Sequence, residues 1–326
     1  MKKLDFFFPV CENPVSYKKG GGSVKKPFSD RTLSARQSEL LMAAVVIARS
    51  TSFVFSKLTV ASMSPFNILA VRFLTAFAIL LALFGGRLRG CARRVVRNGV
   101  LLGLTYSVVM CLEMLGLQRS ESSMASLVEN SAFMLVPLLE IAFLHTWPEK
   151  RNVVGMLLAF AGLLVLNLGP GAHVGAGVWY LLGAMAFYAL AIFLTSIFSR
   201  EGEPLLVGVI QIGTMGVLTL LLSLLFERFR LPATGREWGM ILMLAVVCSV
   251  FGFTLQPVAQ RNLSADRAGM FSVLNPLAAI VWGRLVLAEP LTPTKLLGAA
   301  LILAGILLPT LVKRKDASKN RVGGAE

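Results

Sequence analysis

Ten apolar runs, each about long enough to cross a lipid bilayer as a helix, dominate this sequence of 326 residues. One crossing needs about 20 predominantly apolar residues. Only 15% of the residues are charged, whereas soluble proteins carry roughly a quarter, so the chain has too few charges to cover a water-exposed surface. The sequence therefore predicts an all-α integral membrane protein with ten transmembrane helices. The runs cover approximately residues 40–60, 64–85, 98–118, 122–144, 152–168, 176–198, 204–226, 238–258, 267–288 and 295–312.

Lys and Arg are unevenly distributed between the loops. If the N-terminus is cytoplasmic, threading ten helices puts 23 of these residues on the cytoplasmic side and 5 on the opposite side. Such a bias is the positive-inside pattern. It predicts a multi-pass protein of the cytoplasmic (inner) membrane with both termini in the cytoplasm. The net charge of +15 then needs no nucleic-acid partner, because topology alone explains the basic loops.

The two ends of the chain are polar. Residues 1–38 begin with a short apolar run that contains Asp5 and Pro9, so they do not read as a signal peptide, and we expect a disordered cytoplasmic tail. Residues 313–326 form a basic cytoplasmic tail. Four widely spaced cysteines and two loop histidines show no metal-ligand spacing, and no Gly-rich phosphate loop occurs. We therefore expect no cofactor, no metal and no enzymatic activity.

Two halves of the chain resemble each other at an offset of 143 residues. "GMLLAFAGLLVL" (155–166) shares five of twelve positions with "GAALILAGILLP" (298–309), and "SMASLVENSAFM" faces "DRAGMFSVLNPL" at the same offset. A duplicated unit of five crossings explains the spacing. Because five is odd, the second copy enters the membrane with inverted orientation, as in secondary transporters that bind substrate between their halves.

Several motifs resemble the EamA family of the drug/metabolite transporter superfamily. They are "STSFVFSK", "NILAVRF", "RSESSMASLV" and the long run from "QRNLSADRAGMFSVLNP" to "LLGAALILAGILL". The resemblance implies two inverted repeats of five helices, at 39–168 and 175–312, and favours export. The chain departs from the pattern at Ala48-Arg49, where the family usually has Trp-Gly. Its Glu289 stands before the last helix as expected, whereas the first repeat carries the acidic residue in "HTWPEK".

Seven ionisable residues fall at membrane depth, where a charge costs from about 3 kcal/mol upward. Lys57 and Arg284 lie near helix ends, so snorkelling explains them. We expect Arg49 to face a central cavity and to pair with Glu129 or Glu113, either as a structural ion pair or as part of a substrate clamp. The seven are Arg49, Lys57, Arg72, Glu113, Glu129, Glu140 and Arg284.

Charged, polar and aromatic side chains at similar depth complete the candidate substrate cavity. With both signs of charge present, the cavity suits an amino-acid-like zwitterion or another carboxylate solute. We expect a secondary transporter, an exporter by alternating access, with a coupling proton or ion and a possible homodimer; the alternatives are a membrane-embedded enzyme or a channel-like protein. The candidates are Arg49, Phe53, Arg72, Tyr106, Glu113, Glu129, Asn130, Tyr188, Gln211, Gln256 and Asn275.

Overall fold

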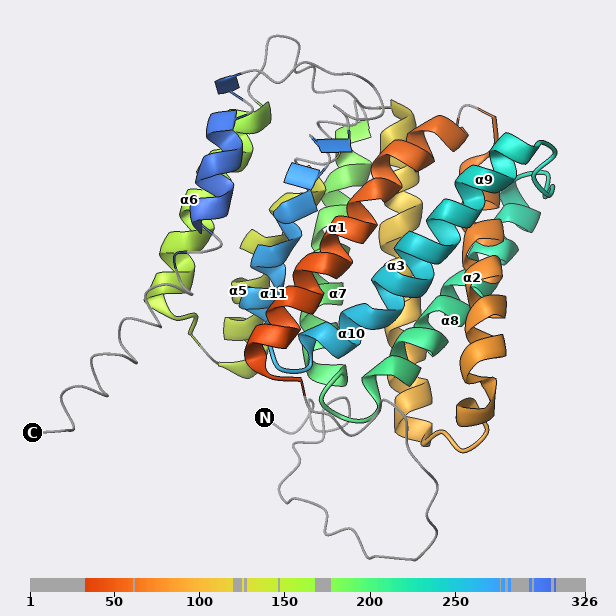
Figure 1. Cartoon of the computed structure of the whole chain (residues 1–326), viewed down its shortest axis with the longest axis horizontal. Helices are drawn as coiled ribbons and strands as arrows, with labels where there is room; N and C mark the ends of the chain where they lie inside the picture. Colours follow the sequence, from red (N-terminus) through yellow and green to blue (C-terminus); the bar gives the residue numbers. More distant parts are fainter. Residues whose placement is uncertain are drawn as a thin grey trace, which may run out of the picture. The chain divides into compact units, whose positions relative to one another are not determined.

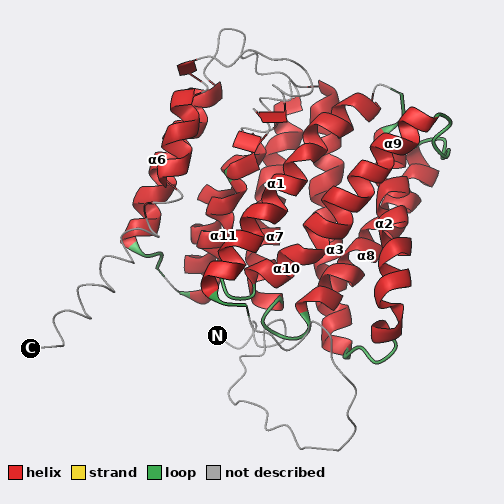
Figure 2. Ribbon diagram, viewed as in Figure 1, coloured by secondary structure: helices red, strands yellow, loops and turns green. Residues whose placement is uncertain are grey.

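The structure is a computed structural model, and all of its described elements are helices (Figure 2). The N-terminal unit, Met1–Thr32, lies outside the described residues, as do the C-terminal tail, Arg284 and Glu289. Six helices are long and apolar enough to cross a membrane among the residues described. The description covers residues 33–60, 62–119, 125, 128–145, 147–167, 177–275, 277–278, 281–282, 293–294, 296–305 and 308.

The residues at the starts of the first two helices suit the backbone N–H groups there. Helix α1, Ala35–Val60, starts with a capping box in which the backbone N–H of Gln37 donates to Ser34 Oγ and that of Ser34 donates to Gln37 Oε1. Helix α2, Pro65–Leu88, has proline at its first position, where no backbone donor is needed. Helix α3 spans Arg93–Arg119.

The fourth apolar run is helical but irregular. It contains the 3₁₀ turn η1 (Ser131–Met134), the short helix α5 (Val136–Leu139) and the π-helix η2 (Glu140–Leu144). Pro137 lies in the middle and cannot donate to the carbonyl four residues earlier, so the hydrogen-bond register changes around it. Helix α6, Lys150–Asn167, follows.

The second half opens with helix α7, Gly177–Phe198, and helix α8, Pro204–Phe226. A continuous span from Gly235 to Gln260 comes next, divided into α9 (Gly235–Met243), the π-helix η3 (Leu244–Phe253) and α10 (Thr254–Gln260). Pro257 lies in α10, and its missing N–H forces the preceding turns away from regular α-helical pairing. Helix α11, Ala265–Ser272, and a helix at Leu296–Gly305 complete the described elements.

Helices from the two halves pack against each other. Helix α2 lies along α8, α3 lies along α7 and α8, and α1 runs beside the α9–α10 span (Figure 1). Helix α6 contacts the 296–305 helix at one side of the bundle through glycines. A Cβ on Gly162 would come within 2.8 Å of the Gly298 carbonyl oxygen, and one on Gly305 within 2.5 Å of the Gly155 oxygen. These small residues let the two backbones approach closely.

The bundle has one end rich in arginine. There Arg87 pairs with Glu203 at 2.9 Å, Arg267 pairs with Glu39 at 3.3 Å, and Arg200 donates to the Leu263 carbonyl. These contacts bring the start of α1, the end of α2, the α7–α8 turn and the start of α11 to the same end. Arg119, Arg228, Arg230 and Arg236 belong to the opposite end, where α3 and α8 finish and α9 begins.

Candidate functional site

Two arginines from the first two helices are buried in the middle of the bundle. Arg49 is 8% exposed and Arg72 is 1% exposed. Arg49 lies halfway along α1 and Arg72 eight residues into α2. Neither position allows the guanidinium to reach water at a helix end, so their partners have to come from neighbouring helices.

Arg49 is held by an amide and an aromatic cage. Its Nη1 donates to Gln256 Oε1 at 2.6 Å and to the Tyr188 hydroxyl at 3.4 Å. Its Cζ lies 4.0 Å from the centre of the Phe253 ring. Gln256 in turn donates through Nε2 to the Tyr106 hydroxyl at 2.8 Å. Four helices therefore orient one guanidinium, and cation–π contact with desolvated rings stabilises its charge.

Arg72 is held by two hydroxyls. Its Nε donates to Ser249 Oγ and its Nη1 to Ser52 Oγ, both at 2.9 Å. Its Nη2 is buried and has no hydrogen-bond partner in the described structure. A buried donor without a partner is costly, so this atom is available to an acceptor that enters the cavity.

The expected direct ion pair of Arg49 with Glu129 or Glu113 is wrong. Among the described residues, no carboxylate oxygen lies within the 4.0 Å ion-pair distance of either buried guanidinium. Instead, Glu113 and Glu129 line the same cavity as the two arginines. Both residues are 3% exposed, and Glu129 Oε2 has no hydrogen-bond partner within the described part of the chain. The charges thus surround a common space without neutralising one another in contact.

That space is a small internal cavity. The centre of a water molecule can occupy about 20 Å³ of it. That is room for about one ordered water and too little for an organic solute. Both arginines and both glutamates line it, so four ionisable groups face the same volume. The lining residues are Arg49, Ser52, Arg72, Met110, Glu113, Glu129, Phe253 and Asn275.

Nine of the residues proposed from the sequence form one connected group. Five line the cavity, and Tyr106, Tyr188 and Gln256 bond around Arg49. Asn130 Oδ1 accepts from the Asn275 amide at 3.0 Å. Gln211 is buried but does not line the cavity, and its amide has no hydrogen-bond partner among the residues described. The side chain of Phe53 lies outside the described part of the chain.

Sequence reasoning missed four residues that build the site. Ser52 and Ser249 carry Arg72, Phe253 lies against Arg49, and Gly252 leaves room for the stem of Arg49. A Cβ on Gly252 would lie 2.6 Å from Arg49 Cγ. Pro257 was the available signal, because a proline four residues after Phe253 disturbs that turn and so changes which side chains face α1.

Lys57 lies outside the cavity, whereas Arg49 lines it, and the sequence had indicated different roles for these two residues. It is exposed near the end of α1, and its Nζ lies 3.5 Å from the Leu117 carbonyl oxygen in the last turn of α3. A cation near the last carbonyls of a helix is in a favourable position. This lysine takes no part in the cavity.

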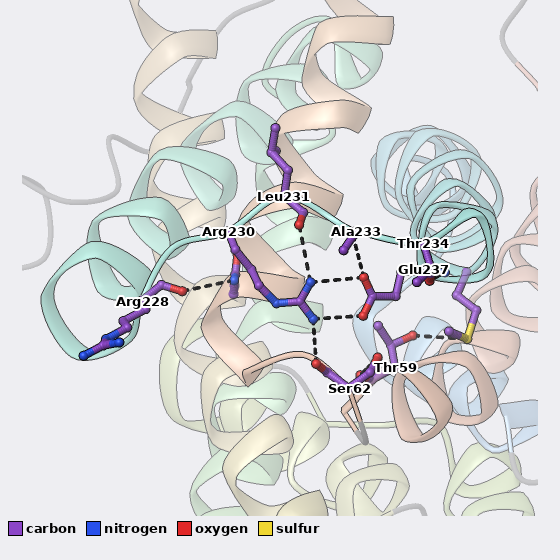
Figure 3. A network of polar contacts seen from close by, with 10 residues as sticks. Thr59, Ser62, Arg228, Arg230, Leu231, Ala233, Thr234 and Glu237 are labelled. Atoms are coloured by element: carbon purple, nitrogen blue, oxygen red, sulfur yellow. Dashed lines mark hydrogen bonds and ion pairs between the residues drawn. The ribbon is translucent and has the colours of Figure 1, made fainter.

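A second polar network closes the arginine-poor end of the bundle (Figure 3). Arg230 forms two hydrogen bonds to the Glu237 carboxylate, at 2.8 and 3.1 Å, and donates to the Ser62 carbonyl at 2.6 Å. The hydrogen bonds to Glu237 raise the pKa of Arg230. Nearby, the Glu227 carboxylate accepts from the N–H groups of Phe66 and Asn67 at the start of α2. The α8–α9 loop is thereby tied to the α1–α2 turn.

The long apolar helices, with charged residues buried around a central cavity, are those of a multi-pass membrane protein. The chain belongs to the EamA-like transporter family, whose model matches residues 36–168 and again residues 175–311. Two matches of one model in one chain agree with the internal similarity seen in the sequence.

Similar proteins from other organisms are also named as transporters. The uncharacterized transporter YetK of Bacillus subtilis is 26% identical over 318 residues, covering 93% of each chain. The uncharacterized inner membrane transporter YedA of Escherichia coli K12 is 26% identical over 287 residues, covering 84% of this chain and 90% of the relative. A solved crystal structure matches with a TM-score of 0.73 at 18% identity, over 86% of this chain and 99% of that chain. This last likeness concerns the fold.

Proposed function

We propose that the protein is a secondary transporter that exports a small zwitterionic or carboxylate metabolite across the cytoplasmic membrane by alternating access. The observation that carries the proposal is the pair of buried arginines on one cavity, with no carboxylate of the described residues within ion-pair distance. A solute carboxylate can accept from the free Arg72 Nη2, and an arginine fork suits a carboxylate geometrically. The facing glutamates supply the opposite sign for an ammonium group.

The proposed architecture is ten crossings in two inverted five-helix repeats with both termini cytoplasmic. Reciprocal packing supports it: α1 lies against the α9–α10 span of the second half, as α7 lies against α3 of the first. Inverted repeats bind solute at their interface near the bilayer midplane, and Arg49 from one half bonds there to Gln256 and Tyr188 from the other. The cavity is too small for a metabolite, so loading requires the two halves to move apart. The mechanism involves binding and movement without a catalytic step.

Transport assays with inverted membrane vesicles test the proposal directly. Vesicles containing the wild-type chain should accumulate one or more radiolabelled amino acids or monocarboxylates from a panel, and vesicles with Arg49→Gln and Arg72→Gln should not. Lys57→Gln is the matched control, because it removes a positive charge from the same helix outside the cavity. Equal uptake by both arginine variants and wild type would overturn the proposed binding site.

Metabolite profiling of cells with and without the gene separates a transporter from an enzyme. A transporter shifts a compound between cells and medium while its total amount stays constant. A change in the total amount of a compound and its product would instead favour a membrane-embedded enzyme. Solute flux that never saturates would favour a channel-like protein.

A further inference from the structure

Five arginines lie within eleven residues where α2 ends and α3 begins, at the lower edge of the bundle in Figure 1. Residues 40–112 contain no Asp or Glu, so a carboxylate for these guanidinium groups has to come from another part of the chain or from outside it. Helix α3 has no acidic residue in its first turn, although negative charge is favourable there. The five are Arg87, Arg89, Arg93, Arg94 and Arg97.

Two carboxylates from the α7–α8 turn reach this cluster. Arg87 Nη2 lies 2.9 Å from Glu203 Oε2. Arg97 Nη2 lies 4.0 Å from Glu201 Oε2, and that oxygen also accepts from the side-chain amide of Asn98 at 2.9 Å. The acidic residues of the neighbouring turn are therefore already engaged by the first and the last arginine of the cluster.

Arg89 and Arg93 lie between these two and are exposed. Arg89 directly follows the last residue of α2, and Arg93 is the first residue of α3. Neither forms an ion pair with any carboxylate in the described part of the chain. A guanidinium group can bind phosphate oxygens through two parallel hydrogen bonds. Both side chains are thus available to an anion from outside the protein.

The surface that continues from these arginines is apolar. One face of α3 carries exposed residues at spacings of four, seven and four, namely Arg93, Arg97, Leu104 and Val108. On α2, Leu83 is 64% exposed. Because α2 and α3 both pack along α8 rather than along each other, their remaining sides face the acyl chains of the bilayer. The arginines therefore lie where the lipid-facing surface ends, at the level of the headgroups.

We infer that the α2–α3 turn is a binding site for the headgroup of an anionic phospholipid, whose phosphate is held by Arg89 and Arg93. Basic clusters directly beside a transmembrane helix attract anionic lipids. The positive-inside pattern explains why arginine gathers at this end, but it does not require arginines to continue the apolar face of a helix. A soluble anion would gain nothing from that face, whereas the acyl chains of a lipid lie along it.

Native mass spectrometry of the full-length protein in detergent tests the inference. The protein is titrated with phosphatidylglycerol and, separately, with phosphatidylcholine of the same acyl chains. Wild type should bind phosphatidylglycerol at least tenfold more tightly. The Arg89→Gln/Arg93→Gln variant should bind it about 25-fold more weakly than wild type, because each arginine near an anionic headgroup contributes about a fivefold factor. Both side chains are exposed, so the variant should fold normally.

The matched control is Arg228→Gln/Arg236→Gln. It also removes two exposed arginines, but from the opposite end of the bundle, where α8 ends and α9 begins. This variant should keep the wild-type affinity for phosphatidylglycerol. Equal weakening in the two double variants, or equal affinity of wild type for the two lipids, would overturn the inference.

Thermal unfolding distinguishes a lipid from a soluble phosphate. Phosphatidylglycerol should raise the unfolding temperature of wild type and leave that of Arg89→Gln/Arg93→Gln unchanged. Glycerol 3-phosphate, which carries the phosphate without acyl chains, should raise neither at the same concentration. An equal rise with glycerol 3-phosphate would indicate a site for soluble anions and refute the lipid. These measurements contain no transported solute, so their outcome is independent of the proposed function.

Discussion

At the scale of single residues, Arg49 contacts Gln256, Tyr188 and Phe253, so we expect its identity to matter for transport. We expect Arg49→Gln to lower transport by more than about tenfold, because a charged hydrogen bond contributes about 1.5–3 kcal/mol. Arg49→Lys should rescue little, since an ammonium cannot engage two acceptors in the plane of a guanidinium. Uptake rates normalised to the amount of protein in the membrane measure the effect. Normal uptake by Arg49→Gln would refute a role for Arg49 in transport.

Gly252 makes a second prediction at this scale. Because an added Cβ would meet Arg49 Cγ at 2.6 Å, Gly252→Ala should lower the free energy of unfolding by about 1–3 kcal/mol and also reduce transport. Gly239→Ala is the matched control in the same span, where no atom of the described residues lies within 4 Å of the new Cβ. That change should be neutral or stabilising by up to about 1 kcal/mol. Thermal unfolding of the purified variants distinguishes the two, and equal stability would contradict the packing argument.

Sequence reasoning could find the ionisable residues of the site but not their partners. Arg49, Arg72, Glu113 and Glu129 are conspicuous because charges are rare in apolar helices. Opposite charges at one depth indicated ion pairs, yet Arg49 donates to Gln256, and the two glutamates only share its cavity. Which side chains face Arg49 depends on how the helix before Gln256 is wound. The π-helix η3 changes that winding, and hydropathy cannot predict a π-helix.

At the scale of elements, the network around Arg230 joins helices that belong to different halves. If the cavity opens toward the arginine-poor end, the bond from Arg230 to the Ser62 carbonyl has to break. Arg230→Gln should therefore favour opening, and a Met110→Cys residue on the cavity should react faster with an impermeant maleimide added from that side. The side chain of Arg230 is 40% exposed, so solvent weakens the pair and the rate should rise only about two- to fivefold.

Arg228→Gln is the control for this element, because Arg228 is an exposed arginine of the same loop whose side chain points away from the network (Figure 3). Its labelling rate should equal that of the parent. High salt should raise the rate in the parent and leave Arg230→Gln unchanged, since screening weakens a partly exposed ion pair. Identical rates in Arg230→Gln and Arg228→Gln would show that the network does not hold this end closed.

Hydropathy predicted the boundaries of several helices well. Where the observed boundaries differ from the predicted ones, a local sequence feature explains the difference. The runs at 204–226 and 176–198 match α8 and α7 to within one residue. Helix α1 begins five residues before its apolar run, because the Ser34–Gln37 capping box sets its start. The fourth run is broken at Pro137, where the apolar pattern continues but the backbone donor is missing.

At the scale of the whole molecule, the orientation in the membrane is a separate prediction. Cys91 lies between α2 and α3 at the arginine-rich end, which the positive-inside pattern places in the cytoplasm. In intact cells an impermeant maleimide should label an Arg228→Cys variant at the opposite end and give the same low signal in wild type and Cys91→Ser. Inverted vesicles should reverse the result for Cys91. Burial and the neighbouring Glu203 raise the pKa of Cys91, so labelling at alkaline pH is needed to generate the thiolate.

Several polar groups of the first half have a partner in the second half. Arg49 bonds to Gln256, Arg72 to Ser249, Asn130 to Asn275, and the first turn of α2 to Glu227. During synthesis, the ribosome completes the first half well before it reaches residues 249 to 275. Until then Arg49 lacks Gln256, and Arg72 keeps only Ser52. We therefore expect a chain that stops before Ser249 to be degraded by membrane quality-control proteases.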